Sequence, residues 1–264
     1  MTPLIFVAVL LVADATPESS LVDMQVEAEA AYRAGLDLRE DSALARPKFA
    51  RAAAAYESLW NGGTRTVAVC RNLAQAHYLA GDLGRAISAY YRGLRLWPHD
   101  SDLRRGLEFA REQVAYPRLG EMADAAKPPA ARTADGWPRD GLALLAAVLY
   151  ALGWFALARV WVTRRGGRWV VAVVAVIVGT AIGLGLRLEN RSERTRWAAP
   201  MAVVVSPGAE LRTGNNDEYP RRLDGRLPAG AELHVLGDRG GWLHVRLANG
   251  PAGWVPRDRV VEVD

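Results

Sequence analysis

The sequence predicts a multidomain α plus all-β protein: an α-helical repeat array, a two-helix transmembrane hairpin and a small β-barrel. Three observations predict this order. Residues 21–116 are rich in Ala, Leu and Arg, which favour helices. Two uncharged apolar runs at 141–158 and 169–186 are long enough to span a membrane. Residues 201–264 alternate Val and Leu with frequent Gly, which is typical of short strands joined by turns.

The composition sets limits on function. Half of the 264 residues are apolar, which is enough to bury a sizeable core. Cys70 is the only cysteine, which excludes an intramolecular disulfide, Cys-based zinc sites and iron–sulfur clusters. The basic surplus lies in residues 121–200, which hold 11 basic and 6 acidic residues. Because these charges flank the apolar runs, we expect no nucleic-acid partner.

Residues 1–15 have the pattern of a signal peptide. An apolar run at 4–13 is followed by Ala13-Asp14-Ala15, a small-x-small sequence that suits signal peptidase. The alternative is a buried first helix. Export would place the chain from residue 16 onward outside the cytoplasm.

Residues 16–116 form the predicted helical domain, in which a 34-residue spacing relates Arg71 to Arg105 and Leu73 to Leu107. Its pattern combines small residues at close helix contacts, large residues in the seam and a terminating proline. The positions are Leu73, Ala74, His77, Gly81, Asp82, Ala86, Tyr90, Gly93, Leu94 and Pro98. This pattern resembles the tetratricopeptide repeat, a helix–turn–helix unit. We expect two repeats, with a long join at 39–47 in the first, and a closing helix at 101–114.

The resemblance implies that the first helix of each repeat lines a concave, partner-binding face. The positions that would line it are Arg71, Gln75, Tyr78 and Arg105. Two stacked arginines could hold a carboxylate or an acidic peptide; the alternative is an ordinary solvated face. Cys70 and His77 fall at positions between helices, where we expect both to be core residues.

The two apolar runs belong to predicted transmembrane helices at 139–162 and 169–188, with a loop at 163–168 between them. A linker at 117–138 precedes them. The alternative, a pair of buried core helices, is disfavoured because soluble helices rarely stay apolar on every face. Tryptophans near the ends of the runs suit the headgroup region; they are Trp137, Trp161, Trp169 and Trp197. A short loop gives an antiparallel hairpin with both flanks on one side.

Arginines in the loop favour a cytoplasmic loop, but arginines in the outer flanks leave the positive-inside count ambiguous. The predicted signal peptide decides the matter. We expect a multi-pass protein of the bacterial inner membrane, with both terminal domains facing the periplasm or exterior. Gly179 and Gly183 form a small-xxx-small pair that could drive dimerisation. We prefer the alternative that they let the two helices of the hairpin approach closely.

A charged linker at 189–200 leads to the predicted barrel at 201–264. Its expected strands are 201–205, 223–227, 232–237, 242–246 and 253–256. The motifs, in chain order, are Leu211-Arg212, Gly214, Tyr219-Pro220, Leu227-Pro228-Ala229-Gly230, Gly241-Trp242 and Gly253-Trp254-Val255. Together they resemble the bacterial SH3 domain, which implies a module that binds cell-wall peptides or partner chains.

The candidate groove of this module consists of Tyr219, Trp242 and Trp254. The alternative is that both tryptophans are part of the barrel structure. His234 and His244 lack a nearby carboxylate or thiolate, so we expect no metal site.

The order of modules resembles the BatE family of the Bat (Bacteroides aerotolerance) operon. The resemblance implies neighbours that are membrane-anchored von Willebrand factor A proteins and a MoxR-type ATPase. We find no motif of a hydrolase, zinc protease, P-loop or dinucleotide-binding enzyme. We therefore expect a non-enzymatic scaffold with no catalytic residues and no cofactor, whose partners are proteins and the lipid bilayer. The alternative is an envelope anchor that binds peptidoglycan peptides through the SH3-like module.

Overall fold

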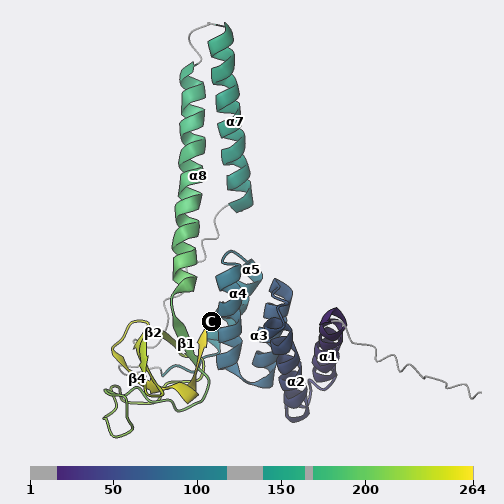
Figure 1. Ribbon diagram of the computed structural model, residues 1–264, viewed down its shortest axis with the longest axis vertical. Coiled ribbons are helices and arrows are strands. Elements are labelled where there is room, and N and C mark those ends of the chain that lie inside the picture. Colours follow the sequence, from purple (N-terminus) through teal and green to yellow (C-terminus); the bar gives the residue numbers. More distant parts are fainter. Residues whose placement is uncertain (1–16, 118–138, 164–168, 264) are drawn as a thin grey trace, which may run out of the picture.

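The computed structural model describes residues 17–117, 139–163 and 169–263 (Figure 1). The expected signal peptide, nearly all of the linker at 117–138 and the loop at 163–168 lie outside these described residues. Within them, five paired helices, a long helical hairpin and a five-stranded sheet follow one another along the chain.

The N-terminal region consists of α1 (Pro17–Asp37), α2 (Ser42–Asn61), α3 (Val67–Ala80), α4 (Leu83–Leu96) and α5 (Ser101–Glu112). Side chains at the N-caps of the last four helices accept hydrogen bonds from backbone amides of the first turn; they are Asp41, Thr66, Asp82 and Asp100. Gly81 ends α3 at a positive φ of 89°, a conformation that favours glycine. The prediction of paired helices is confirmed.

The join predicted at 39–47 is wrong, because α2 already begins at Ser42 and passes through Pro47. Asp41 explains the early start, since its carboxylate accepts from the amides of Ala43 and Leu44. The turn between α1 and α2 is therefore short.

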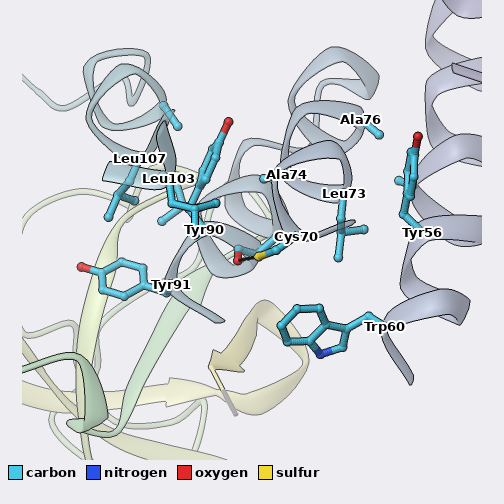
Figure 2. Packing of buried hydrophobic residues seen from close by; sticks show 14 of the residues in the cluster. Tyr56, Trp60, Cys70, Leu73, Ala74, Ala76, Tyr90, Tyr91, Leu103 and Leu107 are labelled. Carbon is cyan, nitrogen blue, oxygen red and sulfur yellow. Dashed lines mark hydrogen bonds between the residues drawn. The ribbon is translucent and has the colours of Figure 1, made fainter. Parts of the chain in front are cut away.

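The helices pack as the small residues predict. Ala74 and Ala86 are fully buried. A Cβ on Gly93 would lie 2.6 Å from Cys70 Sγ, so glycine is what allows α4 to approach α3. Cys70 is a core residue, as predicted, and its thiol donates to Ala89 O at 2.9 Å. Figure 2 shows Cys70 between α3 and α4, with Leu103 and Leu107 of α5 beside them.

The hairpin consists of α7 (Arg139–Thr163) and α8 (Trp169–Ala198), which lie side by side (Figure 1). Among the described residues, one helix is long and apolar enough to cross a membrane, over Gly141–Arg159 with a mean hydropathy of 2.1. The apolar part of α8, Ala172–Leu188, is shorter.

Glycines let the two helices approach. A Cβ on Gly179 would lie 2.9 Å from Ala146 O, and one on Gly153 would lie 2.6 Å from Val176 Cγ2. Gly183 faces open space. Gly179 and Gly153 therefore each allow close approach at a different point of the hairpin, whereas Gly183 does not take part in it.

The segment expected as a linker at 189–200 is mostly helix, because α8 continues to Ala198 and strand β1 begins at Met201. A straight helix thus runs from the apolar hairpin into the sheet, and few residues are left to act as a hinge.

The sheet contains β1 (Met201–Val204), β2 (Glu232–Arg239), β3 (Trp242–Leu247), β4 (Ala252–Pro256) and β5 (Val260–Val263). All pairs are antiparallel and the strand order is β4-β3-β2-β1-β5. Since β4 and β5 lie at opposite edges, the sheet is not closed, and the predicted closed barrel is wrong.

Two of the predicted strand assignments also differ from the structure. Residues 223–227 form no strand and make only an isolated bridge between Leu227 and Ala209. Gly225 adopts a positive φ of 123° there, which interrupts extended backbone. The fifth strand is instead β5, whose Val-rich sequence was not recognised as a strand.

Strand β1 is buried on both faces. Met201 and Val203 belong to the core of the helical region, whereas Ala202 and Val204 belong to the core of the sheet. Because successive side chains of a strand point to opposite faces, β1 lies between the two cores. The helical region and the sheet therefore pack as one body, with α4 covering β1 and β5.

Candidate functional site

A groove of about 720 Å³ opens on the helical region, between α1, α3 and α5. The lining residues are Tyr32, Arg71, Asn72, Gln75, Tyr78, Leu79, Tyr90, Asp102, Arg105, Gly106, Phe109 and Ala110. All four residues predicted for the concave face are among them.

Helical spacing explains how the two main walls form. On α3, Arg71, Gln75 and Tyr78 recur at intervals of four and three residues, which places them on one face. On α5, Asp102, Arg105 and Phe109 recur at three and four.

The remaining contacts define the ends and the floor of the groove. From α1, the Tyr32 hydroxyl lies 3.5 Å from Gln75 Oε1, to which it donates. A Cβ on Gly106 would lie 2.4 Å from the Tyr90 ring, so the absence of a side chain on α5 lets Tyr90 of α4 form the floor. Burial raises the pKa of Tyr90 to about 12.

The two arginines of the groove already hold a carboxylate. Asp102 Oδ2 lies 3.3 Å from Arg71 Nη1, and its Oδ1 pairs with Arg105. The Asp102 side chain is 45 % exposed and that of Arg105 is 75 % exposed, so water reaches the whole cluster. Asp102 was missed by the sequence analysis, although its position three residues before Arg105 on one helix was a usable signal.

Aromatic rings form the other half of the groove. Tyr78 and Phe109 meet edge to face at 5.3 Å between ring centroids, and Phe109 exposes about half of its surface. The groove can therefore contact apolar or aromatic groups at one end and an anionic group at the other.

A second carboxylate cluster lies where the helical region meets the sheet. Glu232 of β2 accepts from Arg111 Nε at 2.6 Å and from Arg111 Nη2 at 2.8 Å. The Tyr91 hydroxyl donates to Glu232 Oε2 at 2.6 Å. The Glu232 side chain is 3 % exposed and that of Arg111 is 13 % exposed. Burial, together with the Glu232 charge, holds the pKa of Tyr91 well above its ordinary value.

The base of α8 is fixed to the same place. Arg95 of α4 donates to Trp197 O at 3.0 Å and to Ala199 O at 3.1 Å. A cation at the C-terminus of a helix satisfies its last carbonyls and its dipole. Tyr91 and Trp197 meet edge to face at 5.3 Å. We call the cluster of Tyr91, Arg95, Arg111, Trp197 and Glu232 the junction.

The predicted groove of the sheet module is brought together only in part. Trp254 of β4 stacks on His244 of β3 at 4.8 Å, and Trp242 lies two residues earlier on β3. Both tryptophans are half-buried. His244 was not predicted as part of this surface, although its alternation with Trp242 was a usable signal.

Tyr219 lies apart from the strands, in a loop, with its ring packed near Gly214. Arg212 holds this loop through the carbonyls of Asp217 and Tyr219, at 2.7 and 2.8 Å. Arg212 also pairs through its backbone with Trp254 of β4, at 2.9 and 2.8 Å, so the loop is tied to that strand. Among the described residues, no ring pair joins Tyr219 to either tryptophan.

The two histidines of the sheet do not face each other. His234 lies opposite Arg246 and His244 lies opposite Gly237. Within residues 17–117, 139–163 and 169–263, no group of three His, Cys, Asp or Glu side chains could hold a metal ion.

Comparisons of the chain with models of protein families, with curated proteins and with solved structures found no match. The resemblances to the tetratricopeptide repeat, the bacterial SH3 domain and the BatE family therefore stay predictions.

Proposed function

We propose that the protein is a non-enzymatic scaffold, anchored in the bacterial inner membrane, whose groove binds a segment of a partner protein. The observation that carries this proposal is the groove itself. It joins two guanidinium groups, two side-chain amides and several aromatic rings, of which Phe109 is exposed, on one face of paired helices. Such a surface suits an extended peptide better than a small substrate, because it is open and holds no acid–base pair placed for chemistry.

The membrane part of the proposal rests on the hairpin. Exposed apolar side chains cover both helices; they include Leu144, Leu152, Phe155, Ile177 and Leu184. We propose that α8 crosses the membrane together with α7, and that the loop between them is cytoplasmic. The helical region and the sheet pack on each other, so both lie on the same side of the membrane, which we propose is the outer side.

The proposed partner segment carries an acidic group that pairs with Arg71 and Arg105, and an apolar residue that packs on Tyr78 and Phe109. By the resemblance to BatE, membrane-anchored von Willebrand factor A proteins are the first candidates. The helical region is then a minimal tetratricopeptide array and the sheet an open relative of the SH3 fold.

Co-purification from native membranes after chemical crosslinking tests this function. We expect the double variant Arg71→Ala/Arg105→Ala to capture at least tenfold less partner protein than wild type does. Arg51→Ala is the matched control, because Arg51 forms an exposed ion pair with Glu27 outside the groove. Equal capture by wild type, the groove variant and the control would refute the groove as the binding site.

The stacked pair of Trp254 and His244 favours a second candidate function, an envelope anchor that binds peptidoglycan peptides through the sheet. Half-buried aromatic rings beside exposed Arg246 offer stacking and a charge. Sedimentation of the detergent-solubilised full chain with purified sacculi tests it. Binding that is lost in Trp254→Ala but retained in Arg71→Ala would favour this function over the scaffold.

A further inference from the structure

We propose that the sheet caps the helical array, and that its docking at the junction holds in place the wall of the groove formed by α5. The inference goes beyond the proposed function, because it concerns how the groove is held in shape whatever binds there. It rests on three observations: the placement of α5, the two faces of α4 and the composition of the junction.

The first observation is that α5 lies between the groove and the sheet. One face of α5 carries Asp102, Arg105 and Phe109 into the groove. Its C-terminal end carries Arg111 to Glu232 of β2, and Val114 just beyond it lies within reach of Gly230. As the last helix of the array, α5 packs on α4 and α3, and its C-terminal end is held by the sheet through Arg111 and Val114. Terminal units of helical arrays need such a cap.

The second observation is that α4 connects the groove to the junction through consecutive residues. Tyr90 forms the floor of the groove beneath Gly106. Tyr91 points to the other side, toward the strands (Figure 2), where it donates to Glu232 and packs on Trp197. A shift of α4 that opens the junction therefore also moves the floor of the groove.

The third observation is that the contact between the helices and the sheet has a polar part and an apolar part. The sheet keeps a core of its own, which includes Leu211, Leu233 and Val245. The junction between them buries an ion pair, whose desolvation offsets much of its attraction. It also buries the Tyr116 hydroxyl, which finds no hydrogen-bond partner among the described residues. The apolar part consists of Met201, Val203 and Val263, which belong to the core of the helical region. A change at the ion pair therefore loosens the junction but leaves the apolar part of the contact in place.

Docking and groove shape are then linked in both directions, because linkage between two sites is reciprocal. A partner that fills the groove stabilises α5 and so favours docking. A change that opens the junction loosens α5 and so weakens the groove, although no residue of the sheet lines the groove.

Amide hydrogen exchange of the full chain in detergent micelles, followed by mass spectrometry, tests this inference without any partner. We expect Glu232→Gln to raise exchange in α5 at least tenfold, while exchange in α1 and α2 stays as in wild type. Tyr91→Phe is a milder second variant that keeps the test valid if Glu232→Gln does not fold. Glu262→Gln is the matched control, because Glu262 pairs with Arg257 within the sheet.

The reverse direction is tested from the groove. Gly106→Ala places a Cβ against the Tyr90 ring, and we expect it to raise exchange in β2 around Glu232. The inference is overturned if Glu232→Gln leaves α5 at the rate of the Glu262→Gln control, or if all five N-terminal helices accelerate equally. Because no partner is needed, this result is independent of whether the proposed scaffold function is correct.

Discussion

The groove and the junction use the same chemistry in opposite surroundings. In each, one carboxylate is held by arginine: Asp102 by Arg71 and Arg105, and Glu232 by Arg111. Asp102 is exposed to water by nearly half, whereas Glu232 is almost completely buried. Only Glu232 also receives a hydrogen bond from a buried tyrosine hydroxyl.

The difference shows that burial decides what a carboxylate–arginine cluster does. An exposed pair contributes little to stability, because water and salt compete for both partners. Its partners are therefore available for exchange with a ligand. A buried pair cannot be opened one side at a time without leaving an unpaired charge, so it fixes two parts of the chain together.

The largest expected effect is at the junction. Glu232→Ala leaves Arg111 buried without its partner, and we expect it to lower the free energy of unfolding by about 3–5 kcal/mol. Thermal unfolding followed by circular dichroism in detergent measures this. A loss below about 1 kcal/mol, the range of an exposed pair, would contradict the claim that Glu232 stabilises the contact between the helices and the sheet.

A smaller loss of stability is expected at the close backbone contact between α4 and β1. A Cβ on Gly84 of α4 would lie 2.3 Å from Val204 O of β1. Because a backbone oxygen cannot turn away, we expect Gly84→Ala to cost about 1–3 kcal/mol. Gly63→Ala serves as a control for glycine substitution, since nothing lies within 4 Å of a Cβ there, although its positive φ adds strain of its own. Equal stability of Gly84→Ala and wild type would mean that α4 and β1 are not in close contact.

Removal of one buried hydroxyl near the junction is expected to increase stability. Burial raises the pKa of Tyr116 and leaves its hydroxyl without a partner in the described residues. Tyr116→Phe removes this unsatisfied group, and we expect it to raise the free energy of unfolding by about 1 kcal/mol. Denaturant titration of both proteins measures the difference. A loss of stability would show that the hydroxyl is satisfied in solution.

In the groove we expect a change in binding without a change in stability. Asp102→Asn removes a carboxylate that competes with the ligand for both arginines, at a stability cost below about 1 kcal/mol. Partner capture should increase and should decline more steeply with salt, because the two free guanidinium groups then attract the ligand alone. Unchanged capture in this variant would mean that neither arginine contacts the partner.

The smallest effect is expected at His77, which is half-buried. Burial holds the pKa of His77 below its ordinary value of 6.5. Its neutral form is therefore favoured in the folded state, and its contribution to stability is present above pH 6.5 and is lost as the pH falls through the folded pKa. We expect wild type to lose slightly more stability than His77→Gln as the pH is lowered from 7 into this range. Melting temperatures of wild type and His77→Gln that fall equally over these pH values would contradict this prediction.

The helical region was predicted well because its signals are local. The spacing from Arg71 to Arg105 and the small residues at Ala74 and Gly93 report contacts within or between neighbouring helices. The four residues that the repeat resemblance implies for a concave face lie among the lining residues of the groove, and their role in partner binding stays a prediction.

The sheet and the junction were predicted less well because their determinants are far apart in sequence. Glu232 lies 121 residues from Arg111, and no local pattern marks either as a partner of the other. Residues 223–227 have Leu at both ends, but Asp224 and Gly225 between them disfavour a strand. The edge strand β5 pairs with β1 and packs on α4, although its Val-rich sequence was also a usable local signal.

Site-specific photocrosslinking in native membranes tests the central claim, that the groove is the partner-binding surface, most directly. A benzophenone amino acid replaces exposed Phe109 in the groove or, as the control, exposed Leu44 on α2 outside it. We expect a discrete protein adduct at position 109 that disappears when Arg71→Ala is added, and none at position 44. No protein adduct at position 109, or the same adducts at both positions, would contradict it.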